Sequence, residues 1–574
     1  MTRPPAPSDA PAAAASVARA GRPFASVLAA AVGVAILLVA LMVVGIVRAW
    51  DPLPFWDMWD GYLGFWYSLA GGDVSAWWAQ HNEHRIVLAR VFFWFDLAFL
   101  HGAGWSLIVV NALSALAIAG AFIAALIARL RETVRGTWRS ARAVMLCVVI
   151  LGLATSWLQR QNLLWGFQIQ FFLAILLPLA AFILLAAAGS SARWSTARYT
   201  ASVVLAVASV GTLAAGIAAP FVATAEGAAL RESRRRVAMM ATAAAVSAAA
   251  YLNGYVSPGQ TASPIHSLAH PRTVLIYVLR FLGGPVELTT QSSLLGAVSA
   301  VILLLLITVS AYRWVRGRDR SRMATAMLAF AAYVLLWAFI TALGRLNFGA
   351  DQALAGRYET PVLALWAAAI VLVAPQILTA RMQRARLLTA ALAAVVVGLV
   401  WVQTGVFADF SGVRFARQSA ALAIALGVPD SGRIHAVFPT PELPVELGAQ
   451  AMRDGLTSLA QPPYPDLRRE LGKPWPTERS APCDVQVSGA TAIAGSDFER
   501  LDGTLTADPA LSGGDPILRV VDSTGLVVGF ADVQQPGDTA PPRAMVAYVR
   551  AELAKGPLRL ADSDVSCTGQ MTMP

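Results

Sequence analysis

Repeated apolar runs of about 20 residues are the feature that most constrains how this chain can fold. A run of that length is enough for a helix to cross the hydrocarbon core of a bilayer, and such runs recur between residues 25 and 405. Only 14% of the residues are charged, whereas 57% are hydrophobic, and soluble domains are about 25% charged. The sequence therefore predicts a polytopic α-helical membrane protein.

Arginines gather in the short loops between these runs, and their placement predicts the topology. Basic loops stay on the cytoplasmic side of a membrane. This explains the net charge of +10 without nucleic-acid binding, which we do not expect. The alternation predicts about 11 transmembrane helices in a bacterial inner (cytoplasmic) membrane, with the N-terminus cytoplasmic and the C-terminus extracytoplasmic. The expected spans are 25–47, 106–127, 143–157, 167–187, 201–215, a return through Phe221, 237–252, 292–311, 323–343, 361–377 and 387–405.

Composition divides the chain into four regions. Residues 1–24 are rich in Ala and Pro and read as a disordered cytoplasmic tail, followed by the transmembrane domain at 25–405, whose first outer loop is 50–103. Residues 406–480 form an extracytoplasmic linker with a helical patch. Residues 481–574 alternate short apolar runs with Gly- and Pro-rich turns, which predicts an extracytoplasmic, β-sandwich-like domain. Cys483 and Cys567 bracket this last region, and we expect a disulfide between them if it lies in an oxidising compartment.

The first outer loop is expected to hold two interfacial helices. Trp59, Tyr62, Leu63, Trp66 and Leu69 recur at helical spacing, which indicates an amphipathic helix lying along the membrane surface. The segment 86–100 is apolar but short. If it crossed the membrane, the arginine cluster after the next helix would face outward, so we assign it as the second interfacial helix.

Two acids open this loop. Asp57 and Asp60 are three residues apart and share a face if the segment is helical. One carboxylate could act as general base for a hydroxyl nucleophile, and the pair could instead hold a divalent cation. The structural alternative is that Asp57 caps a helix while Asp60 is solvated.

A dense polar cluster follows at His81, Glu83, His84 and Arg85. The spacing lacks an HExxH pattern and paired cysteines, so a zinc site is not favoured. Arginines on the outer side run against the usual charge distribution, and binding of an anionic group explains them most simply, because guanidinium groups bind phosphate bidentately. We therefore predict a surface for phosphate and sugar; the alternative is a helix start facing lipid headgroups.

Two later polar islands extend the predicted site. Arg160 and Gln168 flank an outer turn that also carries Trp165; amides and an indole suit a sugar. The loop 344–361 places arginines beside a helix start, where free N–H groups favour anions. Its candidate residues are Arg345, Asn347, Arg357 and Tyr358. For the first island the alternative is a polar helix-end belt with Trp165 as the interface anchor, and for the second it is a plain loop with Tyr358 as the anchor.

The order of these features resembles the GT-C superfamily of integral-membrane glycosyltransferases. The segments HNEHRIVLAR, QNLLWGFQIQFF and AGRYETP are similar to those of a poorly characterised bacterial group related to these enzymes, over about residues 25–405. The chain departs from better-known members in two ways: its acids are separated by two residues, and no HPP-type segment precedes the second interfacial helix.

The resemblance implies a glycosyltransferase that moves a sugar from a polyprenyl-phosphate donor to a cell-envelope glycan or lipid-linked acceptor on the extracytoplasmic face, by single displacement with inversion. Asp57 or Asp60 would be the base, Arg345 and Arg357 would hold the lipid phosphate, and the 81–85 cluster would lie over donor or acceptor. No cofactor is required, although the two acids could hold a divalent metal. The partners are membrane lipid, the lipid-linked sugar and the glycan acceptor.

Two other functions stay open from the sequence. A transporter or flippase of lipid-linked saccharide would carry ionisable groups at mid-membrane depth and inverted repeats, and the long apolar runs carry few charges. A non-catalytic, envelope glycan-binding membrane protein would work mainly through its C-terminal domain.

Overall fold

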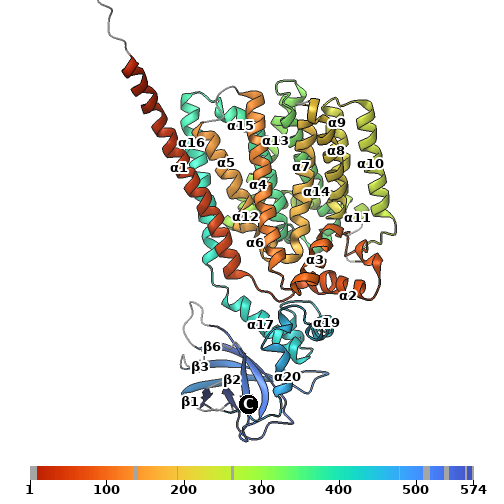
Figure 1. The fold of residues 1–574 in the computed structure, drawn as a ribbon, viewed down its shortest axis with the longest axis vertical. Helices are drawn as coiled ribbons and strands as arrows, with labels where there is room; N and C mark the ends of the chain where they lie inside the picture. Colours follow the sequence, from red (N-terminus) through yellow and green to blue (C-terminus); the bar gives the residue numbers. More distant parts are fainter. Residues whose placement is uncertain are drawn as a thin grey trace, which may run out of the picture.

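A helical bundle and a C-terminal sheet domain make up the computed structural model of the chain (Figure 1). It describes residues 10–134, 140–189, 192–259, 264–476, 479–507, 517–535, 542–562, 565–569 and 571. Within these ranges, 8 helices are long and apolar enough to cross a membrane. The predicted polytopic α-helical membrane fold is thus confirmed. These helices are Ala25–Ala49, Trp105–Thr133, Ala141–Leu164, Gly166–Ala188, Ser293–Val315, Arg322–Phe348, Gly356–Leu378 and Met382–Phe407.

Three further spans were expected from the sequence, and the structure forms shorter or less apolar helices there. They are α8 (Ser195–Ala208), α9 (Ala218–Ala229) and α10 (Arg234–Leu252). At about 1.5 Å per residue, the 14 residues of α8 and the 12 of α9 fall short of a hydrocarbon core of about 30 Å. Helix α10 begins with three arginines, which shortens its apolar part. All three still pack into the bundle (Figure 1).

Helix α1 (Ala10–Ala49) starts earlier than the sequence predicts. Residues 10–24 were expected to belong to a disordered tail, but in the structure they continue the helix toward its N-terminus. Alanine has the highest helix propensity of all residues, and residues 10–20 are mostly alanine. The remainder of the predicted tail, residues 1–9, lies outside the described residues.

The other bundle helices surround one apolar core. Phe122, Phe172, Phe182 and Phe330 are fully buried in it. Several helices begin at a serine whose hydroxyl accepts a backbone N–H, such as Ser321 before α14. The helices are α4 (Trp105–Thr133), α5 (Ala141–Ala154), α6 (Arg160–Leu164), α7 (Ile169–Ala188), α11 (Pro264–Leu268), α12 (Pro271–Thr290), α13 (Ser293–Val315), α14 (Arg322–Arg345), α15 (Glu359–Leu378) and α16 (Met382–Gln403).

The segment between α1 and α4 covers one end of the bundle, which we call the domain end because the sheet domain lies beyond it (Figure 1). It contains a short helical run over Trp56–Ala70, including α2 (Phe65–Ala70), and then α3 (Val87–Leu100). Both are too short to span. Tyr62, Phe93 and Phe167 share a core with Leu422 of the C-terminal region. This segment is therefore packed between the bundle and the C-terminal domain.

The opposite end, which we call the arginine end, is where the arginine-rich loops meet. Arg129 pairs there with Asp319, and Arg322 pairs with Glu232 at 3.0 Å. These pairs link α4 to the loop before α14, and the start of α14 to the loop between α9 and α10.

In the described part of the C-terminal region, the chain forms four helices and an 8-stranded sheet. The helices are α17 (Ser411–Leu426), α18 (Ser431–Ile434), α19 (Glu442–Arg453) and α20 (Leu467–Glu470). The strands are β1 (Arg479–Ala481), β2 (Cys483–Ala492), β3 (Glu499–Ala507), β4 (Ile517–Val521), β5 (Val527–Val533), β6 (Arg543–Val549), β7 (Arg559–Ala561) and β8 (Val565–Cys567).

The strands join in the order β1-β8-β7-β4-β5-β6-β3-β2 as one sheet instead of the two sheets of a sandwich. Both faces of β5 are buried, because Phe530 packs with α17 while Val528 faces the sheet's own core. Cys483 and Cys567 form a disulfide, with their Cα atoms 5.5 Å apart.

Candidate functional site

A cavity of about 450 Å³ opens at the domain end of the bundle. Six segments meet around it: the hairpin 81–84, the start of α7, the turn before α9, the segment after α10, the end of α14 and the turn before α15. Its walls are apolar on the side of Phe171 and Trp337 and charged on the side of Arg345 and Arg357. The remaining lining residues are Glu83, His84, Leu213, Ala214, Ala215, Tyr255, Ser257, Ile340, Thr341, Leu343, Gly344 and Tyr358.

Arg345 and Glu83 form an ion pair at the cavity wall. Arg345 lies in the last turn of α14, and Glu83 lies in the hairpin 81–84. Burial raises the pKa of Glu83, but His84 and Arg345 together lower it by a larger amount. The pKa of Glu83 therefore lies below its ordinary value of 4.5. Glu83 is therefore ionised at neutral pH and offsets the charge of Arg345.

His84 is held as a neutral side chain. Its Nδ1 accepts the backbone N–H of Ala214 at 3.1 Å. Burial lowers the pKa of His84 to about 4, although Glu83, 3.7 Å away, opposes the shift. His84 thus ties the hairpin to the turn before α9 without adding charge to the cavity.

Arg357 is the cation of this cavity with no acidic partner among the described residues. Its guanidinium lies over the ring of Tyr358, 5.2 Å from the centroid. Its backbone carbonyl accepts a hydrogen bond of 2.9 Å from Nδ2 of Asn162, and the same amide nitrogen donates to the Thr360 hydroxyl at 2.7 Å. The turn that carries Arg357 is therefore fixed by a buried amide on α6, and its charge remains available for an anion.

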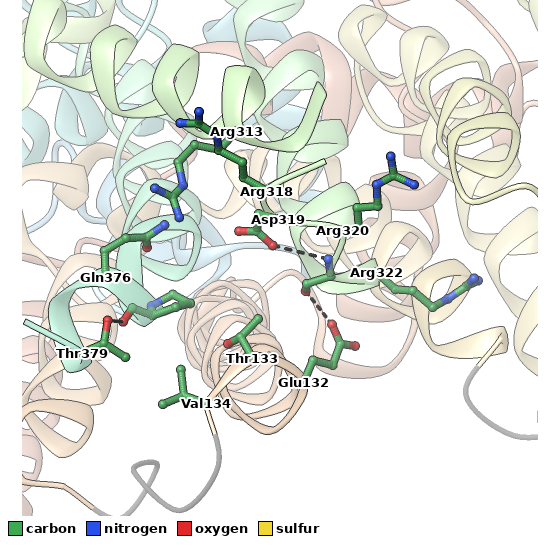
Figure 2. Close-up of a pocket in the computed structure, with 12 residues that line it drawn as sticks. Glu132, Thr133, Val134, Arg313, Arg318, Asp319, Arg320, Arg322, Gln376 and Thr379 are labelled. Atoms are coloured by element: carbon green, nitrogen blue, oxygen red, sulfur yellow. Dashed lines mark hydrogen bonds between the residues drawn. The ribbon is translucent and has the colours of Figure 1, made fainter. Parts of the chain in front are cut away.

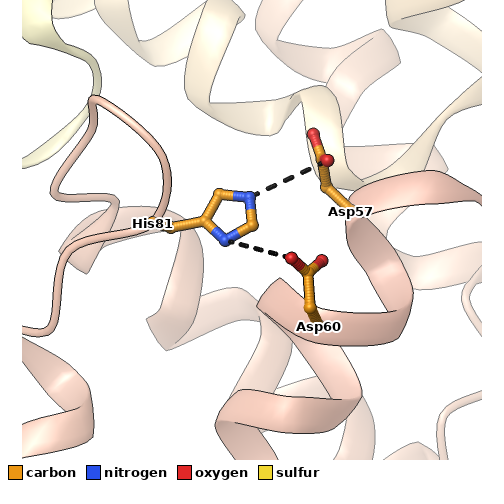
Figure 3. Close-up of side chains that lie close together, drawn as sticks. All are labelled: Asp57, Asp60 and His81. Atoms are coloured by element: carbon orange, nitrogen blue, oxygen red, sulfur yellow. Dashed lines mark ion pairs between the residues drawn. The ribbon is translucent and has the colours of Figure 1, made fainter. Parts of the chain in front are cut away.

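The two predicted acids converge on one imidazole (Figure 3). His81 Nε2 lies 3.9 Å from Asp57 Oδ1, and His81 Nδ1 lies 3.9 Å from Asp60 Oδ2. His81 is buried, whereas both acids are partly accessible. Burial raises the pKa of Asp60 above its ordinary value of 3.8, although His81 opposes this shift. We call Asp57, Asp60 and His81 the acid–histidine group.

This group adjoins the cavity through the hairpin 81–84. His81 and His84 exchange two backbone hydrogen bonds of 2.8 Å, so the hairpin presents His81 to the acids and its other end to the cavity. The site also needs a glycine at position 61. A Cβ atom on Gly61 would lie 2.9 Å from Cε1 of His81 and 2.6 Å from the Phe167 ring, so any larger residue would force the imidazole or the Phe167 ring to shift.

The residues of the acid–histidine group could coordinate a divalent metal. Their ligand atoms all lie within 4.8 Å of one another, and two carboxylates with an imidazole suit ions such as Mn²⁺ or Zn²⁺. Because the two ring nitrogens of His81 face different acids, an ion would bind both acids and only one nitrogen.

Five residues predicted to bind substrate do not line the cavity. One of them, His81, faces Asp57 and Asp60 instead. Arg85 donates instead to the carbonyls of Tyr251, Trp78 and Asn253, at 2.8, 2.7 and 2.7 Å, and so holds the hairpin against the end of α10. Arg160 and Asn347 are exposed elsewhere on the surface, and Gln168 is buried. The structure brings together Glu83, His84, Arg345, Arg357 and Tyr358.

Sequence reasoning did not establish the roles of several residues that shape this site. Tyr255 and Trp337 line the cavity, and Asn162 fixes the Arg357 turn. Trp337 lies inside an apolar run and gives no signal of its own. Asn162 stands in the segment QNLLWGFQ, which drew attention for sugar binding, while its structural role depends on a partner 195 positions away.

No family model matches the chain, and no curated protein matches its sequence. Among solved structures, it is similar to the oligosaccharyltransferase of Archaeoglobus fulgidus in complex with Zn and sulfate, at 14% identity over 78% of this chain, with a TM-score of 0.39. It is also similar to the Archaeoglobus fulgidus oligosaccharyltransferase AglB in complex with an inhibitory peptide and a dolichol-phosphate, at 14% identity over 80% of this chain, with a TM-score of 0.42. The chain covers 60% and 62% of those two proteins.

Proposed function

We propose that this protein is a membrane glycosyltransferase. In this proposal it transfers a sugar from a polyprenyl-phosphate donor to an envelope glycan or lipid-linked acceptor on the extracytoplasmic face of the bacterial inner membrane. The observation that supports it most is the cavity at the domain end, where an apolar wall faces Arg345 and Arg357 and the acid–histidine group adjoins through one hairpin.

The composition of the cavity suits a lipid phosphate. Phe171, Trp337 and Ile340 offer apolar surface for the first isoprene units. Arg357 has no acidic partner among the described residues and could bind a phosphate through its guanidinium fork. Arg345 would bind the same phosphate after its ion pair with Glu83 breaks.

The reaction would be a single displacement. Asp57 or Asp60 takes the proton from the acceptor hydroxyl as its oxygen attacks the anomeric carbon. The bond from that carbon to the phosphate oxygen breaks, and the polyprenyl phosphate leaves with the electron pair. Arg345 and Arg357 stabilise the charge that develops on the phosphate. Attack from the face opposite the leaving group inverts the anomeric configuration.

A divalent metal is an additional element of this proposal. Asp57, Asp60 and His81 would hold it, and when bound it would supply positive charge for orienting a hydroxyl or phosphate oxygen. If a metal ion binds both carboxylates, each becomes a weaker base for the proton transfer. Metal occupancy and base function therefore have to be measured together.

The test uses the full chain in nanodiscs with a radiolabelled polyprenyl-phosphate sugar and an envelope glycan fraction. We expect label in the glycan, and loss of that label in the Asp57→Asn/Asp60→Asn double variant. Glycan analysis of cells with and without the protein would identify the sugar. If intact lipid-linked sugar moved across the membrane of sealed vesicles, and neither the nanodisc assay nor the glycan analysis detected transfer, the protein would be a flippase and not a transferase.

A further inference from the structure

A second, larger cavity of about 700 Å³ lies at the arginine end of the bundle. The end of α4, the loop between α13 and α14, and the end of α15 form its walls (Figure 2). Its lining holds four arginines and two acids, whereas the cavity at the domain end has two arginines and one acid. Its lining residues are Glu132, Thr133, Val134, Arg313, Arg318, Asp319, Arg320, Ser321, Arg322, Pro375, Gln376 and Thr379.

Both acids in this lining already have partners. Asp319 pairs with the buried side chain of Arg129 at 2.5 Å, and Arg129 also donates to the Val371 carbonyl at 2.9 Å. Glu132 accepts the Ser321 hydroxyl and, at 3.4 Å, the backbone N–H of Met323. Figure 2 shows both carboxylates turned toward the start of α14. Neither acid is left to neutralise the remaining arginines.

The arginines are not matched in the same way. Arg322 extends away from the cavity (Figure 2) and pairs with Glu232. Arg313, Arg318 and Arg320 have no acidic partner in the part of the chain that the structure describes. The cavity therefore carries an excess of positive charge, concentrated on Arg313 and Arg318 beside Gln376.

We propose that this cavity binds the phosphate group of an anionic ligand through Arg313 and Arg318. Guanidinium groups bind phosphate through paired, charge-assisted hydrogen bonds, and basic pockets between membrane helices receive anionic lipid headgroups. A loop arginine that only obeys the positive-inside rule needs no cavity, whereas these two line one large enough for a headgroup. The phosphate can belong to a membrane lipid or to a soluble polyphosphate.

The position of the cavity gives such binding a structural consequence. Helix α14 begins at Arg322 beside it and ends at Arg345, and α15 follows Arg357 and ends beside Thr379. A ligand here would contact α14, which carries Arg345, and α15, which follows the turn that carries Arg357. The binding itself does not depend on the proposed transferase activity.

The experiment measures lipid retention by native mass spectrometry of the full chain, released from nanodiscs of phosphatidylglycerol and phosphatidylcholine. We expect phosphatidylglycerol to be retained selectively, and the Arg313→Gln/Arg318→Gln variant to reduce its retention by about 10-fold or more, as expected for losing charge-assisted hydrogen bonds. The matched control is Arg234→Gln/Arg235→Gln, which removes two exposed arginines from the start of α10.

A second arm titrates pyrophosphate into the same proteins in nanodiscs of phosphatidylcholine alone. Pyrophosphate binding that is lost in Arg313→Gln/Arg318→Gln and kept in the control would assign a soluble ligand to the site. Equal effects of the two double variants on phosphatidylglycerol, together with no pyrophosphate binding, would overturn the proposal. Thermal unfolding of both variants checks that they are folded.

Discussion

Arg345 and Glu83 form an ion pair across 262 positions of sequence, at the wall of the cavity that holds Arg357. The pair gives the two arginines unequal roles. A phosphate reaching Arg345 must displace a carboxylate that is ionised at neutral pH, whereas Arg357 offers its charge without such competition.

The first prediction compares the two arginines. Arg357→Ala is expected to lower kcat/KM for a polyprenyl-phosphate sugar by about 10- to 100-fold, because one charge-assisted hydrogen bond to phosphate is worth about 1.5–3 kcal/mol. Arg345→Ala should cost less, since Glu83 offsets part of that charge in the resting site. Steady-state kinetics in nanodiscs measures both.

Glu83→Gln is the matched variant for this comparison. It frees Arg345 of its acidic partner, so KM for the lipid donor should fall while Arg357→Ala still impairs transfer. A larger loss in Arg345→Ala than in Arg357→Ala would contradict the unequal roles.

The second prediction concerns the acid–histidine group. Replacing the base should lower kcat by about 100-fold or more, and the raised pKa of Asp60 favours it over Asp57 for this role. We therefore expect Asp60→Asn to lower kcat more than Asp57→Asn. If the group holds a metal, both variants should also weaken binding of Mn²⁺, measured by electron paramagnetic resonance.

His81→Gln separates the two functions of this group. It removes the ring nitrogens while keeping both carboxylates. Metal affinity should therefore fall, whereas kcat should still depend on Asp60. If kcat were unchanged in both Asp57→Asn and Asp60→Asn, neither acid would be the catalytic base.

The third prediction tests how the Arg357 turn is held. Asn162→Leu removes the amide that donates to the Arg357 carbonyl and to Thr360. Leaving these acceptors unpaired should cost about 1–3 kcal/mol of stability each, and the turn should lose its position. We expect a lower melting temperature and a raised KM for the lipid donor.

Asn347→Leu is the control for this prediction, because Asn347 is an exposed amide outside the cavity lining. It should change neither quantity. An Asn162→Leu protein with a lowered melting temperature and an unchanged KM would show that the amide supports the bundle but not the Arg357 turn.

Part of this architecture was predictable because it depends on local pattern. Hydropathy gave the long membrane helices, and the alternating runs after Cys483 gave the strands. The first outer loop was predictable as a polar island. Its internal arrangement was not, because Arg85 and His81 are alike in sequence as polar neighbours of Glu83. Only the tertiary fold turns Arg85 to three backbone carbonyls and His81 to two acids.

The last prediction follows from the lowered pKa of His84. Burial brings this pKa from 6.5 to about 4 in the folded protein, so between these values the unfolded chain binds a proton that the folded chain does not. Stability should therefore fall as pH drops from about 6.5 toward 4. His84→Asn cannot take up this proton, and its melting temperature should vary less over that window than the wild type's. The matched control is His435→Asn, an exposed histidine whose loss should leave the pH dependence intact. Thermal unfolding in detergent at a series of pH values compares the three proteins, and parallel curves for wild type and His84→Asn would rule out His84 as the source of the acid sensitivity.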